Sequence, residues 1–285
     1  MTENIRYSFS GHDSFYCKSL WLKKGYDFIV ANNDFNAPDA VIKLGVGKNM
    51  VSSIRFWMRA FNLYGEDGLT PIAHYLFDNQ NGKDIYVEDL GTLWLLHYLL
   101  VKSKFASIYN LFFIDFHRER NFEYTREQIQ NFLKRKNAET RYAHLFNENT
   151  VKRDIGVLMQ NYVTPQQNKS NEDFSALLLN LNLLKQSENK SLYFNMKGKN
   201  NLPLEILLYA IIDNKKDENI VSFDKLMDIA LIFCLTKTEL IDAILLLVKK
   251  YSDSVTFTDD GGIKQLFFLK EIDKTEILDT YYIKQ

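Results

Sequence analysis

The stretch that decides the fold, Asn36 to Tyr64, reads NAPDAVIKLGVGKNMVSSIRFWMRAFNLY. It predicts a short helix, a glycine-containing turn and a longer second helix, which is the layout of a helix-turn-helix. Pro38 suits the start of the first helix, where its missing N–H costs nothing. Gly45 and Gly47 allow the backbone to make a left-handed turn between the two helices.

The second helix of this pair carries two opposite stripes. Apolar side chains recur at steps of four, three and four residues and predict a buried face of Met50, Ile54, Trp57 and Phe61. The same spacing on the other side gives a polar, cationic stripe of Lys48, Ser52, Arg55 and Arg59, with no Asp or Glu between Lys43 and Arg59. Such a stripe fits a major groove or a phosphate backbone, although an ordinary solvated helix face has the same pattern.

The centre of the chain repeats this arrangement. Thr125 and Gln128 form a capping box that predicts a helix from Arg126, and further helices are expected over 139–146 and 150–162. The far side of the last helix carries Asn149, Lys152 and Arg153. From Lys102 to Asp154 the chain holds eleven Lys and Arg against seven Asp and Glu, so this second helix-turn-helix-like pattern is locally basic.

The C-terminal part predicts helices followed by a hairpin, which is the winged-helix order. Thr236 and Glu239 form a capping box, and the strand-like runs 255–258 and 263–269 are joined by Asp259-Asp260-Gly261-Gly262, a strong turn signal. From Leu204 onward there are ten Lys and Arg against fifteen Asp and Glu. This acidic balance favours a protein partner over phosphates.

These patterns predict a mainly α fold with small β-hairpins, built from tandem winged-helix or helix-turn-helix-like modules. We expect an N-terminal helix-turn-helix module at 1–85, a central helical module at 86–200 and a C-terminal winged-helix-like module at 201–285. Turn clusters near Gly65 and Gly82 predict a small wing or loop between them, and the apolar run 93–101 predicts a core helix. His97 is expected to be a hydrogen-bonded core residue.

Composition excludes several classes of protein. The net charge is -1, so any affinity for nucleic acid must come from local patches. Cys17 and Cys234 are the only cysteines, which excludes a disulfide framework and suits a reducing cytoplasm. The N-terminus lacks a signal-peptide pattern and no run of eighteen apolar residues occurs. We therefore expect a cytoplasmic protein without a membrane span.

The sequence offers little for catalysis, cofactors or metals. It contains no P-loop, nucleotide-binding glycine fingerprint, HExxH, nucleophile elbow or CxxC. His12 and Cys17 lack plausible third and fourth ligands, so a structural histidine and a packed thiol are expected. The acidic pairs Glu88-Asp89 and Asp259-Asp260 suit helix capping and a hairpin better than a nuclease metal. We expect no catalytic residue, no cofactor and no metal, with a metal-dependent nuclease as a remote alternative.

Several motifs together resemble a known family. They are FSGHDSF at 9–15, WLKKGYD at 21–27, AVIKLGVGKNMVSSIRFW at 40–57, DIYVEDLGTLWLLHYLL at 84–100, TVKRDIGVLMQNYV at 150–163 and GGIKQLFF at 261–268. The chain resembles, almost end to end, the bacterial domain-of-unknown-function family numbered 4007. The resemblance implies a setting among genes for DNA modification and phage defence, often beside homologues of phosphoadenosine phosphosulfate reductase of the kind used in phosphorothioate DNA modification. It implies no catalytic residue.

The leading functional hypothesis is a DNA-binding accessory protein of such a system. Double-stranded DNA would be contacted mainly by Lys48, Asn49, Ser52, Arg55 and Arg59, with Asn149, Lys152 and Arg153 extending the surface. The alternative is a protein-interaction adaptor that scaffolds a modification or defence complex without binding DNA. Phe56 falls outside the apolar stripe and is expected to pack against a neighbouring part of the protein.

Overall fold

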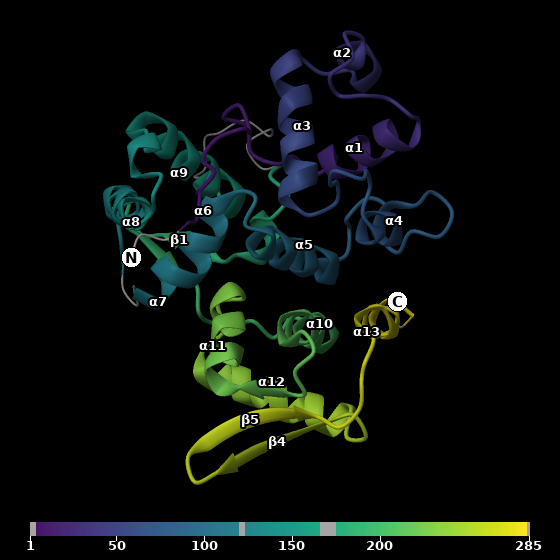
Figure 1. Cartoon of the computed structure of the whole chain (residues 1–285), viewed down its shortest axis with the longest axis vertical. Coiled ribbons are helices and arrows are strands. Elements are labelled where there is room, and N and C mark those ends of the chain that lie inside the picture. Colours follow the sequence, from purple (N-terminus) through teal and green to yellow (C-terminus); the bar gives the residue numbers. More distant parts are fainter. Residues whose placement is uncertain (1–3, 120–122, 166–174, 284–285) are drawn as a thin grey trace. The chain divides into compact units, whose positions relative to one another are not determined.

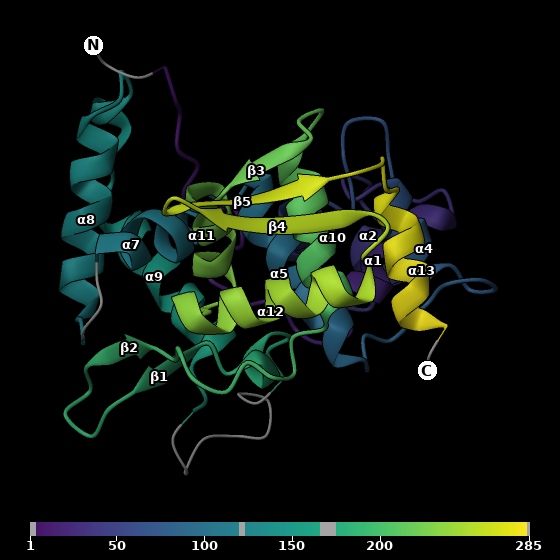
Figure 2. The ribbon, with the colours of Figure 1, turned by 90° about the horizontal axis from the view of Figure 1, so that it is seen from below.

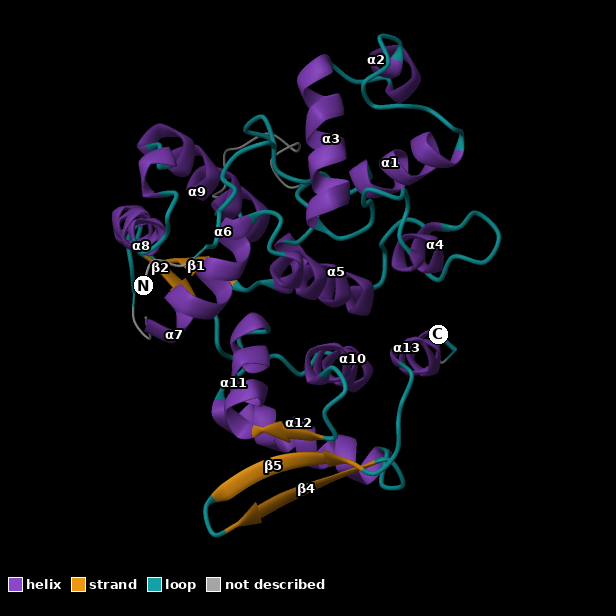
Figure 3. Cartoon of the chain, in the orientation of Figure 1, coloured by secondary structure: helices purple, strands orange, loops and turns teal. Residues whose placement is uncertain are grey.

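The computed structural model describes residues 4–119, 123–165 and 175–283. Its contacts divide the chain into two compact units, unit 1 (Met1–Asn195) and unit 2 (Met196–Gln285), and each is described by itself. Helices dominate both units and the strands form small antiparallel sheets, which confirms the predicted mainly α class (Figure 3). No helix in these ranges is long and apolar enough to cross a bilayer. The predicted three-module division stays a prediction.

Unit 1 is a helical assembly with one small hairpin (Figure 1). Its longer helices are α1 (Trp21–Val30), α3 (Lys48–Ala60), α5 (Leu90–Ser103), α8 (Arg126–Ala138) and α9 (Glu148–Tyr162). Shorter elements are α2 (Ala40–Leu44), α4 (Pro71–Phe77), α6 (Ser107–Asn110), a π-helical turn (Leu111–Phe116), α7 (His117–Glu119), 3-10 turns (Ala143–Leu145, Leu179–Leu181) and strands β1 (Leu184–Gln186) and β2 (Leu192–Phe194).

Helix α5 forms the centre of the unit 1 core. Every residue from Gly91 to Val101 is buried, as the continuous apolar run predicted. Asp89 caps the helix by accepting a hydrogen bond from the Thr92 N–H. His97 Nδ1 lies 2.7 Å from the hydroxyl of Tyr162 on α9, which confirms a hydrogen-bonded core histidine. Because Nδ1 is hydrogen-bonded inside the core and the side chain is fully buried, His97 is a packing residue.

The predicted short helix, glycine turn and longer helix of the N-terminal region are present as α2 and α3. Gly45 ends α2 with φ of +63°, the left-handed conformation that glycine adopts without a steric penalty. Helix α3 crosses α1 at Gly25, where a Cβ atom would lie 2.7 Å from Met58 Cγ. The absent side chain of Gly25 therefore sets how closely α1 and α3 approach.

Two local sequence predictions for unit 1 are wrong. The segment between Gly65 and Gly82 contains helix α4, because Pro71 occupies its first turn and Leu76 and Phe77 are buried. The helix predicted over 139–146 is replaced by turns. There the Asn137 side chain donates to the carbonyls of Tyr142 and Ala143, and such side-chain bonds compete with helical ones.

Helix α8 begins as predicted. The Thr125 side chain accepts from the Gln128 N–H, and the Gln128 side chain accepts from the Thr125 N–H, so both halves of the capping box form.

Unit 2 contains four helices and a three-stranded sheet among its described residues. In chain order these are α10 (Leu204–Lys215), β3 (Ile220–Ser222), α11 (Phe223–Ile232), α12 (Lys237–Lys250), β4 (Val255–Asp260), β5 (Ile263–Phe268) and α13 (Lys274–Tyr282). The antiparallel sheet has the order β3-β5-β4, and Figure 2 shows it lying over the helices of the unit. The Thr236 capping box and the Gly261-Gly262 turn form as predicted, with φ of +60° and +83° at the two glycines.

The close approach at Gly25 generates a stability prediction. Gly25→Ala should destabilise unit 1 by about 1–3 kcal/mol, because the new methyl group overpacks the buried Met58 side chain. Gly156→Ala on α9 is the matched control: nothing lies within 4 Å of its added Cβ, so it should stabilise by about 0.5–1 kcal/mol. Urea unfolding followed by tryptophan fluorescence measures both, since Trp21, Trp57 and Trp94 all lie in unit 1. Equal effects of the two substitutions would contradict the close-packing account.

Candidate nucleic-acid interface

The first two turns of α3 present polar side chains to solvent. Lys48, Asn49 and Ser52 are exposed, whereas Val51, Ile54 and Trp57 are buried. Gly47 occupies the N-cap and no side chain caps the helix, so its first N–H groups have no side-chain acceptor. The exposed start of α3 therefore combines a cation, an amide, a hydroxyl and the positive end of a helix dipole.

The two predicted arginine contacts are held by their own chain. Arg55 Nη1 donates to Asn36 Oδ1 at 2.8 Å, and the Arg59 guanidinium lies 4.8 Å from the centre of the Phe105 ring. Both side chains are half-buried. Both guanidinium groups carry their charge near the surface, but these contacts restrict their side-chain conformations more than that of the exposed Lys48.

Helix α9 also presents its predicted polar side chains. Asn149, Lys152 and Arg153 are exposed, and Asn147 caps the helix by accepting from the Thr150 N–H at 3.0 Å. Lys152 and Arg153 form no ion pair within the described parts of the chain. A hydrogen bond from Lys134 lowers the pKa of the Glu148 carboxyl, so the acidic residue in the first turn already has a cationic partner.

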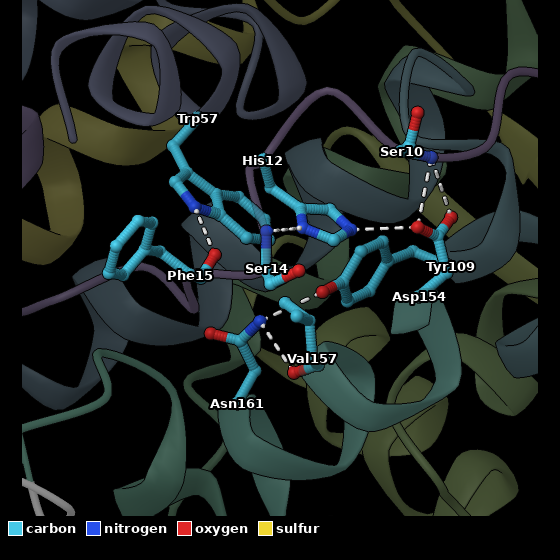
Figure 4. Close-up of polar contacts among 9 residues, drawn as sticks. All are labelled: Ser10, His12, Ser14, Phe15, Trp57, Tyr109, Asp154, Val157 and Asn161. Carbon is cyan, nitrogen blue, oxygen red and sulfur yellow. Dashed lines mark hydrogen bonds and ion pairs between the residues drawn. The ribbon is translucent and has the colours of Figure 1, made fainter. Parts of the chain in front are cut away.

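The N-terminal segment Phe9–Phe15 contacts both helices, and this was not anticipated from the sequence (Figure 4). The His12 ring lies with Nε2 2.8 Å from Asp154 Oδ1 on α9. The Ser10 N–H donates to both carboxylate oxygens of Asp154, at 2.9 and 3.0 Å. His12 and Asp154 are 4% and 3% exposed, so this is a buried interaction.

The tautomer of His12 follows from its neighbours. The Ser14 N–H donates to Nδ1 at 3.1 Å, so Nδ1 accepts and Nε2 carries the proton that Asp154 accepts. On the other side the ring stacks on Trp57 of α3 at 6.2 Å and 18°, and the Trp57 indole N–H donates to the Phe15 carbonyl at 3.1 Å. One short segment thus connects α9 to α3.

The backbone of this segment is unusual. Ser10, Asp13 and Ser14 have φ of +74°, +44° and +64°, and Gly11 has φ of +106°. A Cβ at Gly11 would lie 2.7 Å from Phe56 Cδ2, so Phe56 packs directly on the segment and is buried. The structural roles expected for His12 and Phe56 are both found. Cys17 is fully buried, and burial raises the pKa of its thiol well above the usual value.

The acidic pairs have the local roles expected of them. Asp89 caps α5, and Asp259 forms an ion pair with Lys264 across the β4–β5 hairpin. Within the residues that the structure describes, no three His, Cys, Asp or Glu side chains are grouped so that they could hold a metal ion.

The Asp154 interaction generates a second stability prediction. Asp154→Asn replaces one accepting oxygen by an amide donor that faces N–H groups, so unit 1 should lose about 1–3 kcal/mol of unfolding free energy. Asp13→Asn is the same chemical change on an exposed side chain of the same segment and should stay within about 0.5 kcal/mol of wild type. Urea unfolding monitored by tryptophan fluorescence measures both changes. A neutral Asp154→Asn would mean that the buried pair does not hold the segment in place.

The family model and the similar solved structures each match almost the full length of this chain. A family model described as "Protein of unknown function (DUF4007)" matches residues 9–282. No curated protein matches the chain. Two solved structures are similar, the "Magnesium ion-bound SspB crystal structure" (26% identity, TM-score 0.85) and the "SspB crystal structure" (25% identity, TM-score 0.84). Each alignment covers 98% of this chain and 88% of the other. Since the family model spans nearly every residue, this chain belongs to the DUF4007 family.

Proposed function

We propose that this chain is a DNA-binding accessory protein of a bacterial DNA-modification or phage-defence system. The observation that carries the proposal is the exposed start of α3, where Lys48, Asn49 and Ser52 follow a helix-turn-helix turn. In helix-turn-helix proteins this part of the second helix meets the major groove, where asparagine reads adenine and lysine binds phosphate. The uncapped N-terminus of α3 adds N–H groups that favour an anion.

Helix α9 would extend this contact to a second part of the DNA. Its exposed Lys152 and Arg153 form no ion pair within the described residues; the charge of Lys152 also acts on Glu148, whereas that of Arg153 is available to phosphates. The N-terminal segment links α9 to α3 through His12, and a fixed link between two contact helices supports binding as one unit. Arg55 and Arg59 would contribute charge to the same surface.

The setting of the proposed activity comes from the family resemblance. The resemblance implies a setting among genes for DNA modification and phage defence, including genes of the phosphorothioation type. The likeness to the SspB structures covers both units, so the whole chain rather than one module is shared with them. We propose proteins of such an operon as partners.

The second candidate function is a protein-interaction adaptor, and unit 2 favours it. Its order of helix, strand, two helices and two strands supports a winged-helix assignment, with α12 in the place of the recognition helix. Lysines are exposed at both ends of α12, but the exposed side of its middle carries Asp242 and two leucines, Leu245 and Leu246, each 53% exposed. Such a face suits a protein surface better than phosphates, so we propose that DNA contacts belong to unit 1.

The role we propose is non-catalytic. Cleavage of plasmid DNA by the purified protein with Mg²⁺, lost in a folded Glu88→Ala variant, would overturn that part of the proposal.

The DNA-binding proposal predicts a steep dependence on salt. With four phosphate contacts, log affinity for a fluorescently labelled 30-bp duplex should fall against log salt with a slope of about -3.6. Lys48→Gln removes one phosphate contact, so it should weaken binding and reduce the slope by about 0.9. Fluorescence anisotropy over a salt series from about 50 to 300 mM measures both quantities.

Lys185→Gln is the matched control for this titration. Lys185 is exposed on β1 of the same unit, and the substitution makes the same change of charge, so affinity and slope should match wild type. A flat salt dependence of the wild type, or equal losses in the Lys48 and Lys185 variants, would favour the adaptor function.

A further inference from the structure

Unit 1 has a groove along one side of α1 that the DNA-binding proposal does not use. It has a volume of about 390 Å³, and its floor is a single face of the helix: Leu20, Lys23, Lys24, Asp27, Phe28 and Ala31. Leu44 at the end of α2 and Tyr86 also line it. At 1.5 Å per residue the floor from Leu20 to Ala31 is about 16 Å long, enough for three helical turns or about five extended residues.

The groove combines apolar walls with solvent access. Phe28 and Leu44 are buried beneath it, while Leu20 and Tyr86 stand at its edges, 59% and 58% exposed. Large apolar side chains exposed beside a concave surface are characteristic of sites that receive an apolar side chain of a partner.

The charge of the groove is positive. It is lined by three lysines and one carboxylate. Lys23 is buried and bonded to Asp27 and to Asn79 Oδ1, so those two charges compensate each other. Lys24 Nζ donates to the Leu44 carbonyl at 2.8 Å, a neutral partner that leaves its charge uncompensated. Lys43 pairs with Asp39 at 2.9 Å, but both side chains are about half exposed and such pairs hold each other weakly.

We propose that this groove binds an acidic segment of a partner protein, with a large apolar side chain of that segment seated between Leu20 and Tyr86. Carboxylates flanking the apolar residue would meet Lys24 and Lys43 at the rim. A DNA backbone fits the groove less well, because phosphates make no favourable contact with the apolar residues that form half of the lining. This site goes beyond the DNA contacts on α3 and α9 and does not depend on them.

The test selects peptides against the full-length protein. A phage-displayed library of random 12-residue peptides is bound to wild type after depletion on an Ala31→Trp variant. Ala31 is exposed at the end of α1, so an indole there fills the groove without disturbing the core. We expect enriched peptides that combine Asp or Glu with at least one Leu, Phe or Trp.

A synthetic peptide from that selection is then titrated by fluorescence anisotropy. Lys24→Glu should weaken its binding roughly tenfold, since the substitution replaces attraction by repulsion, and Leu20→Ser should weaken it by removing one apolar wall. Lys185→Glu is the control with the same reversal of charge; β1 lies away from α1 in both ribbon views, and affinity should be unchanged (Figures 1 and 2).

Three results would overturn the proposal: no enrichment, enrichment of basic or uncharged peptides, or equal binding to the Ala31→Trp variant. The 30-bp duplex is titrated against the same variants, where Lys24→Glu should leave DNA affinity unchanged. Loss of DNA binding without any acidic-peptide binding would assign the groove to phosphates instead. A protein that binds no DNA yet binds the peptide would refute only the DNA-binding function.

Discussion

The buried pair of His12 and Asp154 is the interaction on which unit 1 depends. A carboxylate removed from water costs several kcal/mol unless donors surround it, and Asp154 finds them in the Ser10 N–H and the His12 ring. The same ring lies against Trp57, so a polar contact to α9 and an aromatic contact to α3 meet in one side chain. The relative placement of these two helices is therefore tied to a segment far away in sequence.

That segment is held in a conformation it would not adopt alone. Non-glycine residues in the left-handed region cost of order 1 kcal/mol or more each, and Ser10, Asp13 and Ser14 all lie there. The hydrogen bonds to Asp154 and the packing of Phe56 against Gly11 offset this cost. These contacts are buried, and they fix the helices α3 and α9 whose other faces carry the exposed polar side chains.

The sequence correctly predicted those structural features that depend only on residues close together in the chain. The capping boxes at Thr125 and Thr236, the Gly261-Gly262 turn, the left-handed Gly45 and the buried face of α3 all follow from neighbouring residues. The helix predicted over 139–146 failed because side-chain bonds of Asn137 compete with helical ones, and the three-residue strand β3 exists only through its pairing with β5. The sequence did contain one signal of the buried pair, because a charged Asp154 on the apolar side of α9 requires a buried partner. No pattern within α9 could identify His12 as that partner. Some predicted contact residues are already bonded within the chain, as Arg55 is to Asn36. Such bonds also depend on residues that are distant in sequence.

The net charge of the chain is near zero, but the balance of charges differs between the two units. Unit 2 carries twelve Lys and Arg against fifteen Asp and Glu, which leaves 23 against 21 in unit 1. At physiological salt a charge acts over only about 8 Å, so partners respond to such local balances rather than to the sum. Phosphates would be attracted to the exposed cations of α3 and α9, whereas the leucines of α12 and the carboxylates of Asp259 and Asp260 at the β4–β5 turn would not attract them. The two chemistries are thus separated along the chain, with exposed cations on α3 and α9 in unit 1 and exposed leucines on α12 in unit 2.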